Sequence, residues 1–231
     1  MTVVSTGKHV AVAIDGPAGA GKTSTAKTLA EQLDFTYIDT GAMFRAFSVH
    51  KLWLSKELGE PVSNETALNT FDFEFRQGEG VEQDVIVCGK RVNEFLRTPE
   101  VSMEASNVGT DPVVRAAMLA LQRKMAETCD CIMEGRDIGT VVLPNAMLKI
   151  FLTAEPEIRA ERRLKDLGEG HTLEEVLEDI KARDLQDSTR AVAPLKKADD
   201  AILLDNSNLT FEETVCEIMW LVHGRRIRRG S

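Results

Sequence analysis

The chain has 231 residues and a formal net charge of −9, with 43% hydrophobic and 28% charged residues. This length suits one substantial globular domain, because domains commonly hold about 100–200 residues. The negative net charge does not favour binding to nucleic acid, which is itself negatively charged. No apolar run approaches the roughly 20 residues of a membrane helix. We therefore expect neither a nucleic-acid partner nor a membrane partner.

The cysteines indicate a reducing compartment. Cys88, Cys129, Cys131 and Cys216 have neither the spacing of metal ligands nor that of a disulfide framework. Cys129 and Cys131 are two residues apart in an apolar run, so on a strand they would share one face in the core. We expect a cytoplasmic monomer.

The first 58 residues predict a strand–loop–helix–strand–helix order. The run "HVAVAID" (residues 9–15) is typical of a buried parallel strand, and "FTYID" (35–39) is a second strand. Between them Ala26, Leu29, Ala30 and Leu33 recur at helical spacing, and residues 41–58 predict a second helix. This is the βαβ unit of an α/β fold.

A different pattern occupies residues 63–99. "FDFEF" and "DVIVCG" are rich in β-formers, "QGEG" between them predicts a turn, and "KRVNEF" alternates again. Short consecutive strands with tight turns indicate a small antiparallel sheet, which we place in an insert at about residues 63–103.

The α/β pattern then resumes to the end of the chain. A helix begins with proline in its first turn at Pro112, and its buried stripe is Val114, Met118, Leu121 and Met125. "CDCIM", "LKIFLT" and "DAILLD" predict core strands. Thr172 and Glu175 have the spacing of a capping box, and a last helix covers about residues 210–223. We predict one α/β domain, residues 1–231, with a parallel central sheet flanked by helices.

The segment "GPAGAGKT" matches the phosphate-loop pattern G-x-x-x-x-G-K-[ST] at every position. Glycines let successive amide groups point at phosphate oxygens, and the following helix adds its positive end. Lys22 would neutralise the β- and γ-phosphates, and the Thr23 hydroxyl would bind Mg²⁺. The predicted nucleotide-binding residues are Gly16, Pro17, Ala18, Gly19, Ala20, Gly21, Lys22, Thr23 and Ser24.

Two classes of phosphate-loop protein are disfavoured by missing motifs. The sequence contains neither D-x-x-G with N-K-x-D, as a GTPase switch requires, nor the L-S-G-G-Q signature of a transporter ATPase. A small-molecule kinase remains, and it needs cations to neutralise a second phosphate.

Arginines provide the candidates for that second site. Arg45 and Arg136 each follow a predicted core strand, and ligands of open α/β sheets gather at the carboxyl ends of the strands. Arg183, Asp187 and Arg190 are spaced to share one helix face. Asp137, beside Arg136, would read a base or a sugar instead of a phosphate.

A further cluster comprises Arg159, Arg162 and Arg163. It suits either a solvated helix face or a lid, at about residues 155–170, that closes on the transferring phosphoryl group. Gly168 and Gly170 would suit the hinge of such a lid.

Over nearly its whole length the chain resembles the bacterial cytidylate kinases, which are phosphate-loop kinases. The matching strings are "IDGPAGAGKTSTAK", "DTGAMFR", "EGRDIGTVVLPNA", "KIFLTA" and "KARDLQDSTRAVAPL". The resemblance implies transfer of the ATP γ-phosphoryl group to CMP or dCMP with Mg²⁺, and an insert that belongs to the part binding the nucleoside monophosphate.

The resemblance also implies roles for individual residues. Arg45, Arg136 and Arg190 would bind the acceptor phosphate, and Arg183 with Asp187 the sugar. The base would be contacted by Ser106, Arg115 and Asp137. Separately, the need for charge neutralisation in phosphoryl transfer makes Lys22 and the three lid arginines the predicted catalytic residues. Thr40 stands where the family often has serine, and Phe44 where tyrosine occurs, so a hydroxyl contact is lost there.

The chemistry of cytosine agrees with these roles. Its exocyclic amino group donates to a carboxylate such as Asp137, whereas uracil presents an acceptor at that position. Two alternatives remain: a related kinase acting on UMP, AMP or shikimate, and an ATP-dependent regulatory or binding protein on the same scaffold.

Overall fold

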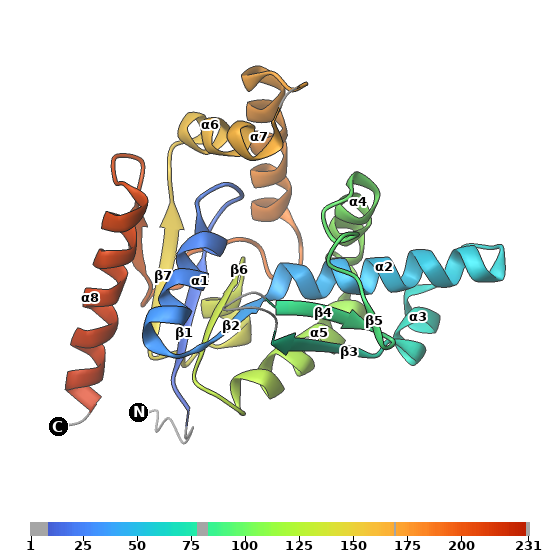
Figure 1. Cartoon of the computed structure of the whole chain (residues 1–231), viewed down its shortest axis with the longest axis horizontal. Coiled ribbons are helices and arrows are strands. Elements are labelled where there is room, and N and C mark those ends of the chain that lie inside the picture. Colours follow the sequence, from blue (N-terminus) through green and yellow to red (C-terminus); the bar gives the residue numbers. More distant parts are fainter. Residues whose placement is uncertain (1–8, 78–82, 169, 230–231) are drawn as a thin grey trace. The chain divides into compact units, whose positions relative to one another are not determined.

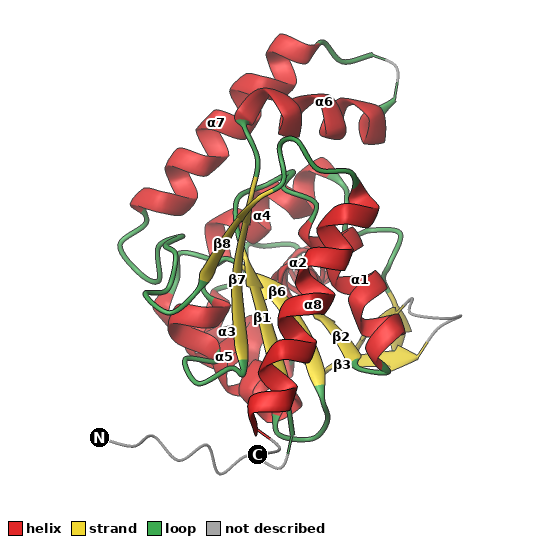
Figure 2. Cartoon of the chain, turned by 90° about the vertical axis from the view of Figure 1, so that its left-hand side faces the viewer, coloured by secondary structure: helices red, strands yellow, loops and turns green. Residues whose placement is uncertain are grey.

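The computed structural model describes residues 9–77, 83–168 and 170–229. The turn predicted at residues 77–80 lies outside the described residues from position 78 onward. The chain divides into two compact units: unit 1 comprises residues 1–38 and 126–231, and unit 2 comprises residues 39–125. Figure 1 labels most of the helices and strands, and Figure 2 also labels β8.

Unit 1 is built on a mainly parallel sheet. Within the described residues its strands are β1 (Ala11–Asp15), β2 (Thr36–Asp39), β6 (Cys131–Gly135), β7 (Leu148–Thr153) and β8 (Ile202–Asp205). Their order across the sheet is β2-β6-β1-β7-β8, and β1 pairs in parallel with both β6 and β7. The central strands β1 and β6 are almost entirely buried, in agreement with the apolar residues at their start; each also buries one carboxylate near its end, Asp15 and Glu134.

The helices of unit 1 are α1 (Lys22–Leu33), α6 (Pro156–Leu167), α7 (Leu173–Thr189) and α8 (Phe211–Arg229), with a short π-helix, η1 (Ile138–Val142), after β6. In Figure 2, α1 and α8 lie on the same face of the sheet. Their apolar stripes pack with the strands, and the core there includes Ile14, Leu29, Ile150 and Ile218. Packing of this amphipathic face positions the amino end of α1 beside the end of β1.

Unit 2 combines a small antiparallel sheet with helices. Its helices are α2 (Thr40–Leu58), α3 (Asn64–Thr70), α4 (Pro99–Val108) and α5 (Pro112–Ala126), and the described strands are β3 (Phe73–Gln77), β4 (Gln83–Val87) and β5 (Lys90–Arg91). Strand β4 pairs antiparallel with β3 and β5. Val85 and Val87 pack against one side of α2, and Met118 of α5 packs with Phe47.

The predicted fold class is confirmed in both sheets, and the capping box of α7 is present, with Thr172 and Glu175 exchanging hydrogen bonds. Two expectations were wrong. The segment "KRVNEF" was expected to form a strand along its length, but strand β5 ends at Arg91. The chain turns there, and the Asn93 side chain accepts a hydrogen bond from the Val85 amide at 2.8 Å. Cys129 is half-buried and precedes β6, so it does not share a strand face with the buried Cys131.

Candidate nucleotide site

The phosphate loop joins the carboxyl end of β1 to the amino end of α1. Gly19 and Gly21 have φ values of 75° and 85°, which favour glycine, and Gly21 is the N-cap of α1. A Cβ atom on Gly16 would lie 1.9 Å from the carbonyl oxygen of Leu152 in β7. The loop therefore requires glycine for both its backbone shape and its close approach to the sheet, which leaves a cradle of the kind that binds phosphates.

Lys22 is buried at the start of α1, and its Nζ donates to the Pro17 carbonyl at 2.7 Å. Burial, followed by the nearby Arg136 guanidinium, lowers the pKa of Lys22 to about 7. A triphosphate beside this amine would favour its charged form. The helix start and the lysine together fit an anionic ligand, while Thr23 is half-buried on the same turn.

Asp15 is a site residue that the sequence analysis missed. It is the last residue of β1, is buried, and accepts from the amides of Ile138 and Gly139 at 2.7 Å each. Burial raises the pKa of Asp15 to about 6. Its position at the carboxyl end of a core strand was the available signal. Asp15 therefore ties the loop strand to η1, which follows Arg136 and Asp137.

The Asp15 pKa leads to a stability prediction. The folded-state pKa lies above the ordinary value of 3.8, so the folded protein binds more protons than the unfolded chain between about pH 4 and pH 6. The stability that Asp15 contributes relative to a non-titrating residue should therefore fall as pH rises through that window, by an amount on the order of 3 kcal/mol. Urea unfolding of the wild type and Asp15→Asn at several pH values measures the difference, and equal pH slopes would contradict the assignment.

The three arginines of α6 differ in burial and in their contacts with the phosphate loop. Arg159 is buried; its Nε donates to the Ala154 carbonyl at 2.8 Å, its Nη1 donates to the Ala18 carbonyl at 3.0 Å, and its Nη2 lies 2.7 Å from Asp184 Oδ2. Arg162 is half-buried, whereas Arg163 is exposed. Arg159 thus links the phosphate loop to α7.

Arg162 acts through Asn206, a second residue missed from the sequence. Its guanidinium donates to the Asn206 side-chain and main-chain oxygens, both at 2.9 Å. The buried Asn206 in turn donates to the Ala20 carbonyl of the phosphate loop at 3.2 Å. No local pattern marks Asn206, because its contact with the loop spans most of the chain.

The structure brings four of the predicted acceptor-site residues of unit 1 into one ion-pair network. Arg136 Nε donates to Asp187 Oδ2 at 2.7 Å, and Arg190 lies 3.9 Å from the other oxygen of Asp187. Arg190 also contacts Asp137 Oδ1 at 3.4 Å. Arg183 lies one turn earlier on α7 and is exposed. Alternating charges of this kind fix guanidinium groups at the end of β6.

Unit 2 carries the other predicted acceptor residues. Arg45 donates to Asp39 Oδ2 at 2.9 Å, and Asp39 caps α2 by accepting from the Ala42 amide. The Nε of Arg45 is buried and has no hydrogen-bond partner within the described residues, so its donor capacity fits an anionic ligand. Thr40, in the first turn of α2, is buried.

The remaining unit 2 candidates lie on α2, α4 and α5. The Arg115 guanidinium stands 5.8 Å from the centre of the Phe44 ring and donates to the Gly109 carbonyl. Ser106 donates to the Ser102 carbonyl of its own helix at 3.3 Å. Arg115 and Phe44 are thus brought together, with a cation–π geometry that holds the guanidinium in place.

A phosphate loop with a buried lysine, at the carboxyl end of a central strand of a parallel sheet, defines a phosphate-loop nucleotide-binding protein. A family model described as cytidylate kinase matches residues 12–224. Proteins named cytidylate kinase from Bacillus thuringiensis (strain Al Hakam) and Bacillus cereus (strain AH187) are each 44% identical over 220 residues, covering 94% of this chain and 97% of theirs. The chain belongs to the cytidylate kinase family, which confirms the resemblance found in its sequence.

A solved structure of an uncharacterized protein from Eubacterium ventriosum ATCC 27560 has a similar fold. It aligns with a TM-score of 0.53 at 13% identity and covers 93% of this chain and 99% of its own. That likeness concerns the fold alone. Among the described residues, no helix has both the length and the hydropathy needed to span a bilayer.

Proposed function

We propose that this protein transfers the γ-phosphoryl group of ATP to CMP or dCMP, which gives CDP or dCDP and ADP. The observation that carries the proposal is the buried Lys22 in the phosphate loop, in a chain 44% identical to proteins named cytidylate kinase. The Arg136–Asp187–Arg190–Asp137 network supports an anionic acceptor that also bears a base.

The donor side of the proposed reaction rests on residues 16–24. The loop amides and the amino end of α1 bind the triphosphate, and Lys22 neutralises its β- and γ-phosphates. The Thr23 hydroxyl and phosphate oxygens would hold Mg²⁺, which would supply further neutralisation of charge. Buried contacts of Arg159 and Asn206 with the loop carbonyls hold the cradle in shape.

The roles on the acceptor side follow from the resemblance to the cytidylate kinases, and the charge network of unit 1 supports them. Arg45, Arg136 and Arg190 bind the monophosphate, while Arg183 and Asp187 bind the sugar. The base is contacted by Ser106, Arg115 and Asp137, with Thr40 and Phe44 lining the same part of α2. A phosphate monoester is mostly ionised near neutral pH, so positioning and charge neutralisation drive the transfer without a strong general base.

The proposal includes a cytoplasmic monomer. Support for the compartment comes from the four cysteines, all of which are free thiols, as is typical of a reducing environment.

A coupled assay of ADP formation across CMP, dCMP, UMP, AMP and shikimate tests the acceptor. Preference for UMP, AMP or shikimate would replace the proposal with the related-kinase alternative, and the absence of any turnover would favour a binding protein.

The α6 arginines give a prediction about catalysis. We expect alanine at Arg159, Arg162 or Arg163 to lower turnover strongly in at least one variant, by about tenfold or more, with CMP affinity little changed. Arg159→Ala and Arg162→Ala also leave buried carbonyls without donors, so thermal unfolding should separate stability from turnover. Arg163 is exposed and tests turnover alone. Wild-type turnover in all three variants would leave Arg159 and Arg162 with a structural role at the phosphate loop and Arg163 as a solvated side chain.

A further inference from the structure

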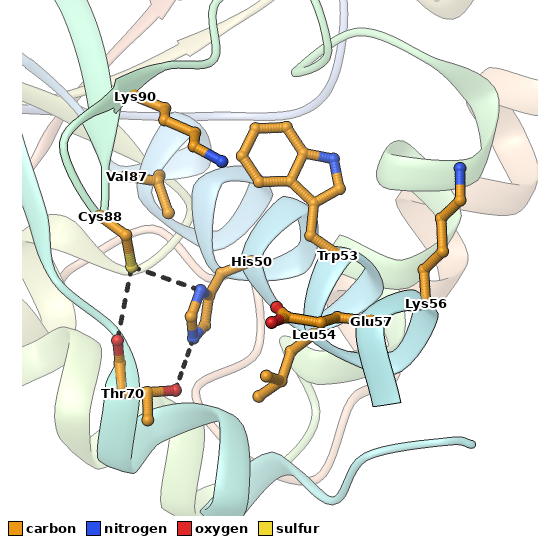
Figure 3. Close-up of a pocket in the computed structure, with 9 residues that line it drawn as sticks. All are labelled: His50, Trp53, Leu54, Lys56, Glu57, Thr70, Val87, Cys88 and Lys90. Carbon is orange, nitrogen blue, oxygen red and sulfur yellow. Dashed lines mark hydrogen bonds between the residues drawn. The ribbon is translucent and has the colours of Figure 1, made fainter. Parts of the chain in front are cut away.

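A pocket within unit 2 contains none of the residues assigned above. Its volume is about 480 Å³, and it opens between α2, the end of α3 and the β4–β5 turn. Figure 3 shows its lining residues, which are His50, Trp53, Leu54, Lys56, Glu57, Thr70, Val87, Cys88 and Lys90. The pocket therefore combines a thiol, an imidazole, two lysines and an apolar wall.

Cys88 is held at the pocket by a tight turn. Val87 and Lys90 are paired in the β4–β5 hairpin, so Cys88 and Gly89 form its two-residue connection. Their φ values are 48° and 76°, the left-handed conformation of a type I′ turn, in which Asn or Gly is the ordinary choice. A cysteine in this conformation places an exposed thiol at a fixed point of the pocket.

His50 presents an unprotonated nitrogen to that thiol. Its Nε2 lies 3.1 Å from the Ala67 carbonyl, which only accepts, and 2.9 Å from the Thr70 hydroxyl. Nε2 must therefore carry the proton and donate. Burial lowers the pKa of His50, so the ring is neutral near pH 7 and its Nδ1 is an acceptor. Nδ1 lies 3.6 Å from Cys88 Sγ.

The thiol proton has two acceptors within reach, His50 Nδ1 and the Thr70 carbonyl, which lies 3.4 Å from Sγ. Only the imidazole is basic enough to remove the proton. Removal of the thiol proton by an adjacent imidazole, as the sulfur attacks, is the way in which a neighbouring base activates a cysteine nucleophile. Figure 3 shows both contacts as dashed lines.

We infer that Cys88 and His50 form a reactive thiol site that accepts low-molecular-weight disulfides carrying carboxylates. His50 Nδ1 takes the proton from Cys88, and the thiolate attacks one sulfur of the disulfide RS–SR. The S–S bond breaks, the Cys88–S–SR mixed disulfide forms, and the leaving thiolate takes up the proton to give RSH. The disulfide is the oxidant, and its second sulfur is reduced.

The charges of the pocket point to the class of disulfide. Lys90 on β5 presents its ammonium group to the pocket; in Figure 3 the Glu57 carboxylate points toward His50, whereas Lys56, the second lysine of the lining, points away. The Lys90 Nζ stands 5.7 Å from the centre of the Trp53 ring, while Leu54 and Val87 supply apolar surface. A carboxylate of a small peptide disulfide would pair with Lys90, on the side of the pocket away from Glu57, and its carbon chain would pack on the apolar wall.

The first experiment uses oxidised glutathione with the intact protein at pH 7, followed by mass mapping of each cysteine. The chain provides its own references, because Cys216 on α8 is exposed and Cys131 is buried. Cys88 should form the mixed disulfide about tenfold or more faster than Cys216, and dithiothreitol should reverse it. A Cys88 rate equal to or below that of Cys216 would overturn the proposal.

The second experiment separates activation by His50 from exposure. His50→Gln keeps a donor for the Ala67 carbonyl but lacks a base, so the Cys88 rate should fall by about tenfold while Cys216 is unchanged. Protection of Cys131 in the same sample reports that unit 1 is intact, and the fluorescence of Trp53 in a Trp220→Phe background reports on unit 2. An unchanged Cys88 rate with Cys131 still protected would remove His50 from the site; loss of Cys131 protection calls for the same measurement on His50→Asn.

The third experiment tests the charge preference. Lys90→Glu should slow the reaction of Cys88 with oxidised glutathione by about three- to tenfold, but not its reaction with the neutral 4,4′-dithiodipyridine. Trp53 reports adducts in the pocket once Trp220→Phe removes the other tryptophan. Equal effects on both probes, or none on either, would overturn the assignment to carboxylate-bearing disulfides.

Discussion

Replacing Lys22 with methionine should lower turnover by about a hundred- to a thousandfold while CMP binding and the fold are retained. Methionine keeps much of the side-chain volume but removes the ammonium group that we propose to neutralise the triphosphate. The fold should tolerate the change because burial already opposes the charge, as the lowered Lys22 pKa of about 7 indicates.

Lys27 gives a matched control on the same helix. It lies on α1 with its Nζ 5.9 Å from the centre of the Tyr37 ring, away from the loop carbonyl that Lys22 contacts. Lys27→Met should retain turnover near the wild-type value. Steady-state kinetics and CMP titration of both variants measure the contrast, and full activity of Lys22→Met would refute the assignment of the phosphate loop.

Asp137→Asn should change base preference more than it changes overall activity. The substitution keeps the shape, removes the charge and adds a donor that suits the uracil carbonyl. Loss of a charged hydrogen bond is worth about 1.5–3 kcal/mol, so the specificity constant for CMP should fall roughly ten- to a hundredfold. UMP should lose less or gain, because its mismatch with a carboxylate is relieved.

Asp187→Asn provides the comparison for that experiment, because Asp187 belongs to the same network and accepts from Arg136 at 2.7 Å. It should weaken CMP and UMP together and leave their ratio of specificity constants unchanged. Asp137 also contacts Arg190 at 3.4 Å, so a positioning effect is the competing explanation. If the ratio is constant in both variants, Asp137 holds Arg190 and does not read the base.

Local signals in the sequence were sufficient for the phosphate loop and for most elements of both sheets. Glycines at this spacing (residues 16–21) between a buried strand and a helix indicate a phosphate loop, and Thr172 with Glu175 marks a helix start. Helices α3 and α4 were missed, although Ser63 and Thr98 cap them, because each short helix buries few apolar residues. Capping alone is a weaker signal than periodicity.

The site residues that could not be predicted from the sequence are those whose roles depend on contacts between distant parts of the chain. Asn206 contacts Ala20 across most of the chain, and Asp15 acquires its role only when η1 brings the amides of Ile138 and Gly139 to it. The same holds for the thiol site, where His50 lies 38 residues from Cys88. Such pairs cannot be predicted from the spacing of residues along the chain.

The order of strands in unit 1 has a consequence for how the protein is made. Strands β1 and β2 are synthesised first, yet β6, which begins at Cys131, is the strand that lies between them. Unit 2 is one continuous stretch, residues 39–125, and leaves the ribosome before β6 does. During synthesis unit 2 can therefore fold first, while the apolar faces of β1 stay exposed until β6 has been synthesised and can pair with it. A ribosome pause just before residue 131 would prolong the stage at which the nascent chain most needs a chaperone.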